Sequence, residues 1–165
     1  MTLDGGTLDT SAPVAVDNCA ITDAKIASHT TTKITVPLSQ LATCAKKEAI
    51  IIAAGDECTA ICVATGKTEF QMPYAFTLTD IRATVTTAPT TSGTLTVDVN
   101  EGGTSILSTK LTIDVGEKTS TSAATPVVIS DTSLADEGII TIDVDAVSGG
   151  ASEAGLKVYL IGYQT

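Results

Sequence analysis

The chain has 165 residues and a formal net charge of −10, and 43% of its residues are hydrophobic but only 3% aromatic. This acidity excludes the basic, phosphate-neutralising surface that most nucleic-acid-binding proteins present. The length suits one domain, with or without an extension, rather than a two-domain enzyme, and its core must be built from Val, Ile, Leu and Ala.

The sequence predicts neither a membrane segment nor a secretion signal. No run approaches the roughly 20 apolar residues that span a bilayer, and the N-terminal "MTLDGGTLDT" lacks a basic region followed by an apolar one. We therefore expect a reducing compartment and free thiols, although four cysteines could in number form two disulfides. The cysteines are Cys19, Cys44, Cys58 and Cys62.

Residues 1–47 are predicted to form an extended arm. The first 18 residues mix Gly, Thr, Asp and Pro without a helical or strand period. A short strand is expected at Ile34–Leu38, where Pro37 restricts it to an edge. Residues 1–46 carry four acids and three lysines, whereas the rest of the chain carries fifteen acids and six bases. The arm is thus nearly neutral and the remainder strongly acidic.

Residues 48–165 are predicted to form a jelly-roll-like antiparallel β-sandwich, so the fold class is all-β. "EAIIIAAGD", from Glu48, suits a buried strand, and "CTAICVATG" carries a second short β pattern. "EFQMPYAFTLTDIRATVTT" predicts a longer strand that bends near Asp80, where the apolar parity changes. Three alternating strands and "LKVYLIGY" complete the set, with turn signals at the spacing of a sandwich. The alternating aliphatic residues are Leu95, Val97, Val99, Leu111, Ile113, Val115, Ile140, Ile142 and Val144.

The most regular stretch, Thr96 to Thr121, is interpreted as one β-hairpin with an apolar and a polar side. Because each sheet of such a sandwich buries one face, the acids that alternate with the aliphatic residues are predicted to point to solvent. These acids are Asp98, Asp114, Asp143 and Asp145.

No catalytic, cofactor or metal site is predicted. Structural zinc sites usually combine two close pairs of ligands, but only Cys58 and Cys62 are close in the sequence. The single histidine, His29, lies in the predicted arm, which argues against a Ser-His-acid triad on a rigid scaffold.

Weaker alternatives involve acidic and glycine-containing segments. The four alternating acids could pair as glycosidase carboxylates, and "DVDAVSGG" or "VNEGG" could bind calcium, but a solvated acidic face is favoured over both. "ATGKTEF" lacks the spacing of a phosphate-binding loop and is interpreted as a turn.

Four segments of the predicted sandwich have a distinctive sequence: "MPYAFTLTDIRA" at 72–83, "VDVNEGGTSILSTKLTID" at 97–114, "GEKTST" at 116–121 and "LKVYLIG" at 156–162. Together they resemble the jelly-roll domain that recurs in virion proteins of tailed bacteriophages. The resemblance covers about Glu48 to Gly162. Cys58 and Cys62 depart from the Thr and Leu-type residues expected in that strand.

The resemblance implies a structural, non-enzymatic module of the virus particle, displayed as a homotrimer and without a cofactor. Made in the host bacterial cytoplasm, it would lie on the outer surface of the phage head and contact the major capsid protein, but neither nucleic acid nor membrane. A capsid decoration (cement) protein is favoured over a short head-fibre or tail-associated protein that binds host glycans. The reasons are the scarcity of aromatic side chains and the absence of a stalk repeat. A polysaccharide-cleaving enzyme is a third hypothesis.

The expected contacts follow from this interpretation. The arm would lie across neighbouring capsid subunits and contact them through its aliphatic side chains. Arg82, the only arginine, and Tyr74 are expected to form trimer or ion-pair contacts. The capsid-contacting candidates are Leu3, Leu8, Val14, Val16, Ile21, Ile26, Ile34, Val36 and Leu38.

Overall fold

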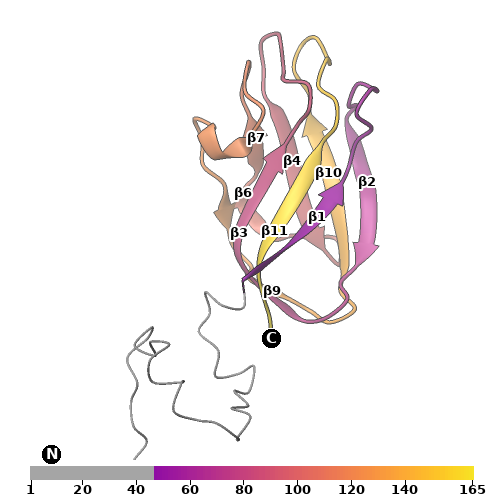
Figure 1. Ribbon diagram of the computed structural model, residues 1–165, viewed down its shortest axis with the longest axis vertical. Coiled ribbons are helices and arrows are strands. Elements are labelled where there is room, and N and C mark those ends of the chain that lie inside the picture. The colour runs from indigo at the N-terminus through magenta and orange to yellow at the C-terminus, as the bar shows by residue number, and fades with distance from the viewer. Residues whose placement is uncertain (1–46) are drawn as a thin grey trace, which may run out of the picture. The chain divides into compact units, whose positions relative to one another are not determined.

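The computed structural model describes residues 47–165, which form an antiparallel β-sandwich (Figure 1). The predicted strand at Ile34–Leu38 and the rest of the predicted arm up to residue 46 lie outside the described residues. Within the described part, no helix is long and apolar enough to cross a membrane. Its helical structure is the short 3₁₀ helix η3 (Ser120–Ser122).

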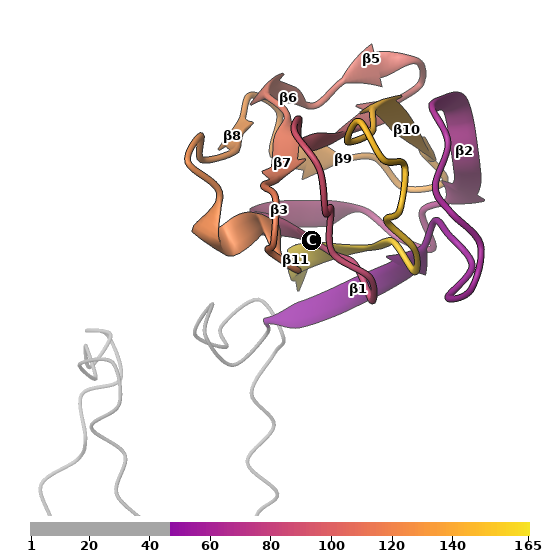
Figure 2. The ribbon, with the colours of Figure 1, turned by 90° about the horizontal axis from the view of Figure 1, so that it is seen from above.

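Two sheets pack face to face, as the view along the strands shows (Figure 2). The first sheet contains, in spatial order, β1 (Glu48–Ala53), β11 (Lys157–Gln164), β3 (Phe76–Thr84) and β9 (Ser133–Leu134). The second contains β2 (Ala64–Gln71), β10 (Ile139–Ala146), β4 (Leu95–Glu101) and β5 (Thr104–Ser105), and β7 (Leu111–Ile113) also pairs with β4. A short additional pair joins β6 (Leu107–Thr109) to β8 (Val128–Ile129).

This strand order is that of a jelly roll. If β5 to β7 are taken as one interrupted strand, and β8 with β9 as another, the first and last strands are neighbours in one sheet. The chain alternates between the sheets except at β4 and the β5–β7 strand, which follow each other in the second sheet. The predicted all-β, jelly-roll-like sandwich is therefore confirmed for the described residues.

Aliphatic side chains from both sheets fill the core. The alternating residues predicted to point inward on β4, β7 and β10 are at most 1% exposed. Phe76 of β3 is the largest fully buried side chain. Val115 is an exception at 46% exposed, because β7 ends at Ile113 and the chain has already turned away from the sheet.

Three predictions about the first strands are wrong. β1 is an edge strand with one face open, so that Ile51 is 58% exposed rather than buried. Residues 58–63 form a loop, and the second strand starts only at Ala64. "ATGKTEF", predicted as a turn, lies inside β2, where Gly66 accommodates a local irregularity with a φ of 60°.

The stretch Thr96 to Thr121 is not one hairpin. β4 turns into β5 through Gly102 and Gly103, whose φ values of 56° and 84° are those of a two-residue hairpin turn. The chain then leaves the sheet, pairs as β6 with β8, and returns as β7 beside the first half of β4. The consecutive buried residues Ile106 and Leu107 interrupt the alternation at this change of partner.

The loops β1–β2, β3–β4 and β10–β11 meet at one end of the sandwich (Figure 1). The backbone N–H of Ile61 donates to the carbonyl of Glu153 at 2.7 Å, which joins the first loop to the third. An isolated bridge between Thr87 and Ala154 joins the second loop to the third. These three loops therefore support one another.

The opposite end holds both ends of the described chain. Glu48 of β1 pairs with Gly162 of β11, two residues before the last strand ends. The described chain therefore begins and ends at the end of the sandwich away from the three joined loops (Figure 1).

Candidate functional site

The two outer faces of the sandwich differ in chemistry. We call the outer face of β2, β10 and β4 the acidic face; its central residues are Asp98, Asn100, Asp143 and Asp145. We call the outer face of β1, β11 and β3 the tyrosine face; its central residues are Ile51, Tyr159, Ile161, Tyr163, Asp80 and Arg82. Each face is considered in turn as a candidate site.

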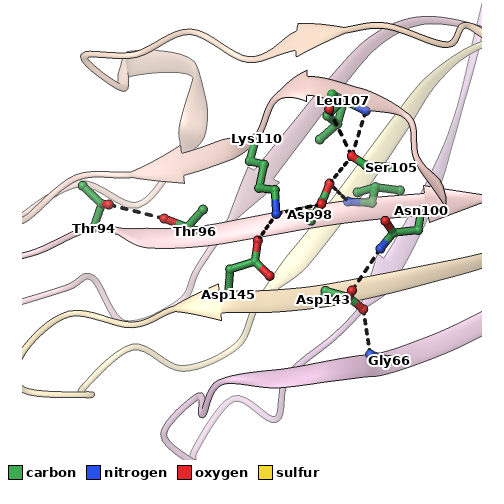
Figure 3. Close-up of polar contacts among 11 residues, drawn as sticks. Gly66, Thr94, Thr96, Asp98, Asn100, Ser105, Leu107, Lys110, Asp143 and Asp145 are labelled. Atoms are coloured by element: carbon green, nitrogen blue, oxygen red, sulfur yellow. Dashed lines mark hydrogen bonds and ion pairs between the residues drawn. The ribbon is translucent and has the colours of Figure 1, made fainter. Parts of the chain in front are cut away.

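Asp98 is buried on the acidic face, with an exposed fraction of 5% (Figure 3). Its Oδ1 accepts hydrogen bonds from the Val99 N–H at 2.8 Å and from the Ser105 hydroxyl at 2.7 Å. Its Oδ2 lies 3.0 Å from Lys110 Nζ. The carboxylate thus lies at the gap between β5 and β7, where β4 has no strand partner on the side away from β10. The prediction that Asp98 points to solvent is wrong, because the chain crosses over it at this gap.

Lys110 joins two strands of the acidic face. Its Nζ lies 2.6 Å from Asp145 Oδ2 and 3.0 Å from Asp98 Oδ2. The hydrogen bonds to Asp145 and then to Asp98 raise the pKa of Lys110 well above its usual value. The ammonium group therefore bridges β4 and β10 in this structure.

Asp143 makes a second bridge across the same face. Its Oδ1 accepts the Gly66 N–H from β2 at 2.6 Å, and its Oδ2 accepts the side-chain amide of Asn100 on β4 at 3.0 Å (Figure 3). The carboxylate is only half-buried, but both of its oxygens are engaged. Asp143 therefore fastens β10 to both of its neighbours.

These contacts bear on the alternatives considered for the acids. Within residues 47–165, no group of three or more His, Cys, Asp or Glu side chains is placed to hold a metal ion. Asp114 is half-buried and accepts the Ala124 N–H at 2.8 Å, which anchors the loop after β7. Of the four acids, Asp145 is the most exposed, as predicted, although its carboxylate pairs with Lys110. The acidic face is thus a hydrogen-bonded lattice of side chains that still carries excess negative charge.

The tyrosine face is built by cross-strand neighbours. Tyr159 of β11 lies opposite Ile51 of β1 on one side and Arg82 of β3 on the other. Ile161 lies opposite Asp80, and Tyr163 continues the same row along β11. Because cross-strand partners point to the same side of a sheet, these residues share one outward surface. Two of the three tyrosines of the chain lie on it.

Ion pairs neutralise the charges on this face. Arg82 Nη2 lies 2.6 Å from Asp80 Oδ2, and its Nε donates to the same oxygen at 2.8 Å. Lys157 at the upper end of β11 pairs with Glu57 of the β1–β2 loop. The hydrogen bonds from Lys157 and then Thr86 lower the pKa of Glu57. The row of Tyr159, Ile161 and Tyr163 along β11 is therefore bordered by two ion pairs, each with no net charge.

A cleft of about 220 Å³ adjoins the tyrosine face beside Arg82. It exists because β9 pairs with only Phe76 and Thr77 of β3, while η3 attaches further along, where the Ser120 hydroxyl accepts the Ala83 N–H at 2.9 Å. The middle of β3 between these contacts borders the cleft. The lining residues are Asp80, Ile81, Arg82, Ser120, Thr121, Ala123, Pro126 and Val127.

Arg82 and Tyr74, predicted as contact residues, lie apart. Arg82 forms an ion pair within its own strand and neighbours Tyr159. Tyr74 lies in the β2–β3 loop, with its ring centroid 6.4 Å from that of Phe76. Burial, and then the carboxylate of Glu48, raise the pKa of Tyr74. The ion pair expected of Arg82 is present, whereas a role of either residue in a trimer stays a prediction.

The remaining sequence-based candidates are only partly described. Cys58 and Cys62 are exposed free thiols in the β1–β2 loop, and Lys67 Nζ donates to Cys62 Sγ at 3.5 Å. Cys19, Cys44, His29 and the predicted capsid-contacting residues fall outside the described part. The last group comprises Leu3, Leu8, Val14, Val16, Ile21, Ile26, Ile34, Val36 and Leu38.

Sequence reasoning missed the tyrosine face and Glu153. The period of "LKVYLIGY" could have placed Tyr159 and Tyr163 on one outward side. Glu153 is 0% exposed, and its Oε1 accepts the Ser148 N–H at 2.6 Å, whereas its Oε2 has no hydrogen-bond partner in the described chain. Burial raises the pKa of Glu153, but hydrogen bonds from its own N–H and from Ser148 and Ser152 outweigh it and lower the pKa. No sequence signal distinguishes this glutamate from a surface residue.

Comparison with protein-family models, with characterised proteins and with solved structures finds no match to this chain.

Proposed function

We propose that the chain is a structural protein of a tailed-bacteriophage particle, and more specifically a capsid decoration (cement) protein that assembles as a homotrimer on the head. The proposal rests on the agreement between two residue ranges, that of the fold and that of the resemblance. The jelly roll runs from Glu48 to Gln164, and the part of the sequence that resembles phage virion modules runs from about Glu48 to Gly162. The resemblance therefore spans a whole folded unit rather than isolated strands.

In this proposal the two parts of the chain have separate tasks. Residues 1–46 attach to the capsid lattice, and the sandwich is displayed. The described chain begins at Lys47, so in this proposal the joined loops at the opposite end of the sandwich face away from the capsid. One attached segment binds modestly, because ordering a residue costs about 1–2 kcal/mol. Three segments held in one trimer raise the avidity by roughly 10² to 10⁴ over a single segment.

The acidic face supports a display role. Asp98, Asp143 and Lys110 are engaged with one another or with neighbouring strands, so little hydrogen-bonding capacity is left for other molecules. The surplus negative charge also repels other acidic particles, because like-charged surfaces resist association. Such a surface suits a protein that covers a shell without causing particles to aggregate.

The proposal is tested by removing residues 1–46 and measuring binding to undecorated phage heads. We expect the truncated chain to keep the circular-dichroism spectrum of a β-sandwich and to lose binding. A matched control is the full chain with Ile139→Asp, which adds charge to the acidic face and should bind as the unaltered chain does. Full occupancy by the truncated chain would contradict the assignment of attachment to residues 1–46.

Imaging of the intact particle separates the decoration role from its alternative. Density at local three-fold axes across the whole shell is expected for a decoration protein. Density at a single vertex or on the tail, together with glycan binding by the purified chain, would instead support a short head-fibre or tail-associated protein that recognises host sugars.

A further inference from the structure

We infer, on the basis of the homotrimer in the proposed function, that copies of the chain meet through the tyrosine face, with Ile51 of one copy inserted into the cleft beside Arg82 of the next copy. The proposal names the surface through which the copies assemble, which the sequence alone did not indicate. Three features of the described residues lead to it.

The first feature is the residue types on the tyrosine face. Tyrosine and arginine are enriched in the buried centres of protein interfaces, where they carry much of the binding energy. Tyr159 and Tyr163 lie on the same face as Arg82, with Ile161 between them along β11. Ile51 beside them is 58% exposed, which is the largest value for a strand residue among the exposed large hydrophobic side chains of the described chain. This is the composition of an interface centre rather than of a solvated sheet.

The second feature is charge. Residues 47–165 carry fifteen acids and six bases, so two copies repel each other over most of their surfaces. On the tyrosine face, Arg82 is balanced by Asp80 and Lys157 by Glu57. A second acidic copy can therefore approach this face without facing unbalanced carboxylates. The acidic face offers no such approach.

The third feature is the placement of a protruding side chain and a hollow. Ile51 lies on β1, the edge strand at one margin of the face, and the cleft lies beyond β3, at the other margin. The cleft volume of about 220 Å³ exceeds the roughly 150 Å³ of a cavity that binds benzene. An aliphatic side chain therefore fits, and Val127, Pro126 and Ala123 supply apolar walls.

A protrusion and a hollow on one face are compatible with two symmetries. A twofold axis matches them twice, since residue i of one copy then contacts residue j of the other and j contacts i, whereas a head-to-tail contact matches them once per interface and closes into a ring. The homotrimer of the proposed function selects the ring.

The first experiment is a disulfide test on the full chain. All four native cysteines are replaced by serine, and Ile51→Cys is combined with Thr121→Cys. Within one chain these positions are separated by β11 and β3, about 10 Å or more at the usual strand spacing, which is beyond the roughly 7 Å limit for a disulfide. Oxidation is expected to give covalent dimers and trimers on a non-reducing gel. Each single variant should stop at the dimer or give no product. A double variant that stays monomeric, or that stops at the dimer, would overturn the inference.

The second experiment measures mass by sedimentation equilibrium. The unaltered chain is expected at three times the monomer mass, and Ile51→Asp at the monomer mass with an unchanged circular-dichroism spectrum. The matched control is Ile139→Asp, because Ile139 is also an exposed isoleucine, at 40%, but lies on the acidic face; it should stay trimeric. A trimeric Ile51→Asp would refute the inference alone, whereas a monomeric unaltered chain would refute the homotrimer of the proposed function together with it. Neither result depends on binding to phage heads, so attachment through residues 1–46 is judged separately.

Discussion

Replacing Asp98 by alanine is expected to destabilise the sandwich by about 2–4 kcal/mol. The carboxylate accepts from Val99 N–H at 2.8 Å and from the Ser105 hydroxyl at 2.7 Å, and it pairs with Lys110 at 3.0 Å. Neutral hydrogen bonds contribute about 0.5–1.5 kcal/mol each and bonds to charged groups about 1.5–3. The total is reduced because Ser105 keeps its contacts with Leu107, and Lys110, 43% exposed, keeps Asp145 and access to water.

The assay is urea unfolding followed by circular dichroism, with the midpoint and the slope fitted separately. Asp98→Asn keeps the shape of the side chain and an acceptor for Val99, so it should cost about half as much. The control is Asp145→Ala, which removes the exposed partner of Lys110 and should cost no more than about 1 kcal/mol. If Asp98→Ala stays within about 0.5 kcal/mol of the unaltered chain, as surface substitutions usually do, the buried carboxylate does not hold the gap between β5 and β7.

Three further predictions concern single residues. Gly162→Ala should cost about 3 kcal/mol or more in urea unfolding, because the added Cβ would overlap the backbone carbonyl of Thr77; a cost below 1 kcal/mol would show that the bulge can widen. Stability should fall as the pH drops through and below 4.5, the ordinary pKa of glutamate, because the folded chain holds the pKa of Glu153 lower. Glu153→Gln should flatten this part of the pH profile, and an equally steep profile would contradict the assignment. In a spectrophotometric titration, one tyrosine should ionise above the usual pKa of 10.0, and Tyr74→Phe should remove that step.

Much of the fold could be predicted because the alternation of apolar and polar residues along a strand indicates which side chains are buried. Leu95, Val97 and Val99 share one side of β4 with a period of two, and all three are fully buried. The parity change near Asp80 was also informative, since the register between β11 and β3 shifts between Ile161 and Gly162, opposite that point. These signals arise locally, from side chains on one strand and its immediate partner.

The change of partner between β5 and β7 could not be predicted in this way. The adjacent apolar residues Ile106 and Leu107 interrupt the period, but they do not indicate that the backbone leaves one sheet there and pairs with β8. Asp98 was likewise predicted to face solvent, although the crossing chain covers it. Burial there depends on contacts between segments that a periodic pattern cannot encode.

The tyrosine face illustrates a second limit. The tyrosines of "LKVYLIGY" and the arginine of β3 are more than 70 residues apart in sequence, and only the β11–β3 register places Tyr159 beside Arg82. The cleft depends further on where β9 and η3 stop along β3. A surface assembled from several strands becomes visible only once the strand order is known.

Because Glu48 pairs with Gly162, the first and last strands of the sandwich lie side by side. The order of the strands along the chain can therefore be changed without changing their order in the sheets. A circular permutant could be opened at the Gly102–Gly103 turn, where an added Cβ would meet no atom within 4 Å, and closed by a short linker from Thr165 to Lys47. Both changes fall on exposed backbone, where new termini are best tolerated. Such a chain would retain every ladder except the two-residue pairing next to the cut, which would make the sandwich a scaffold whose termini can be moved to a chosen turn.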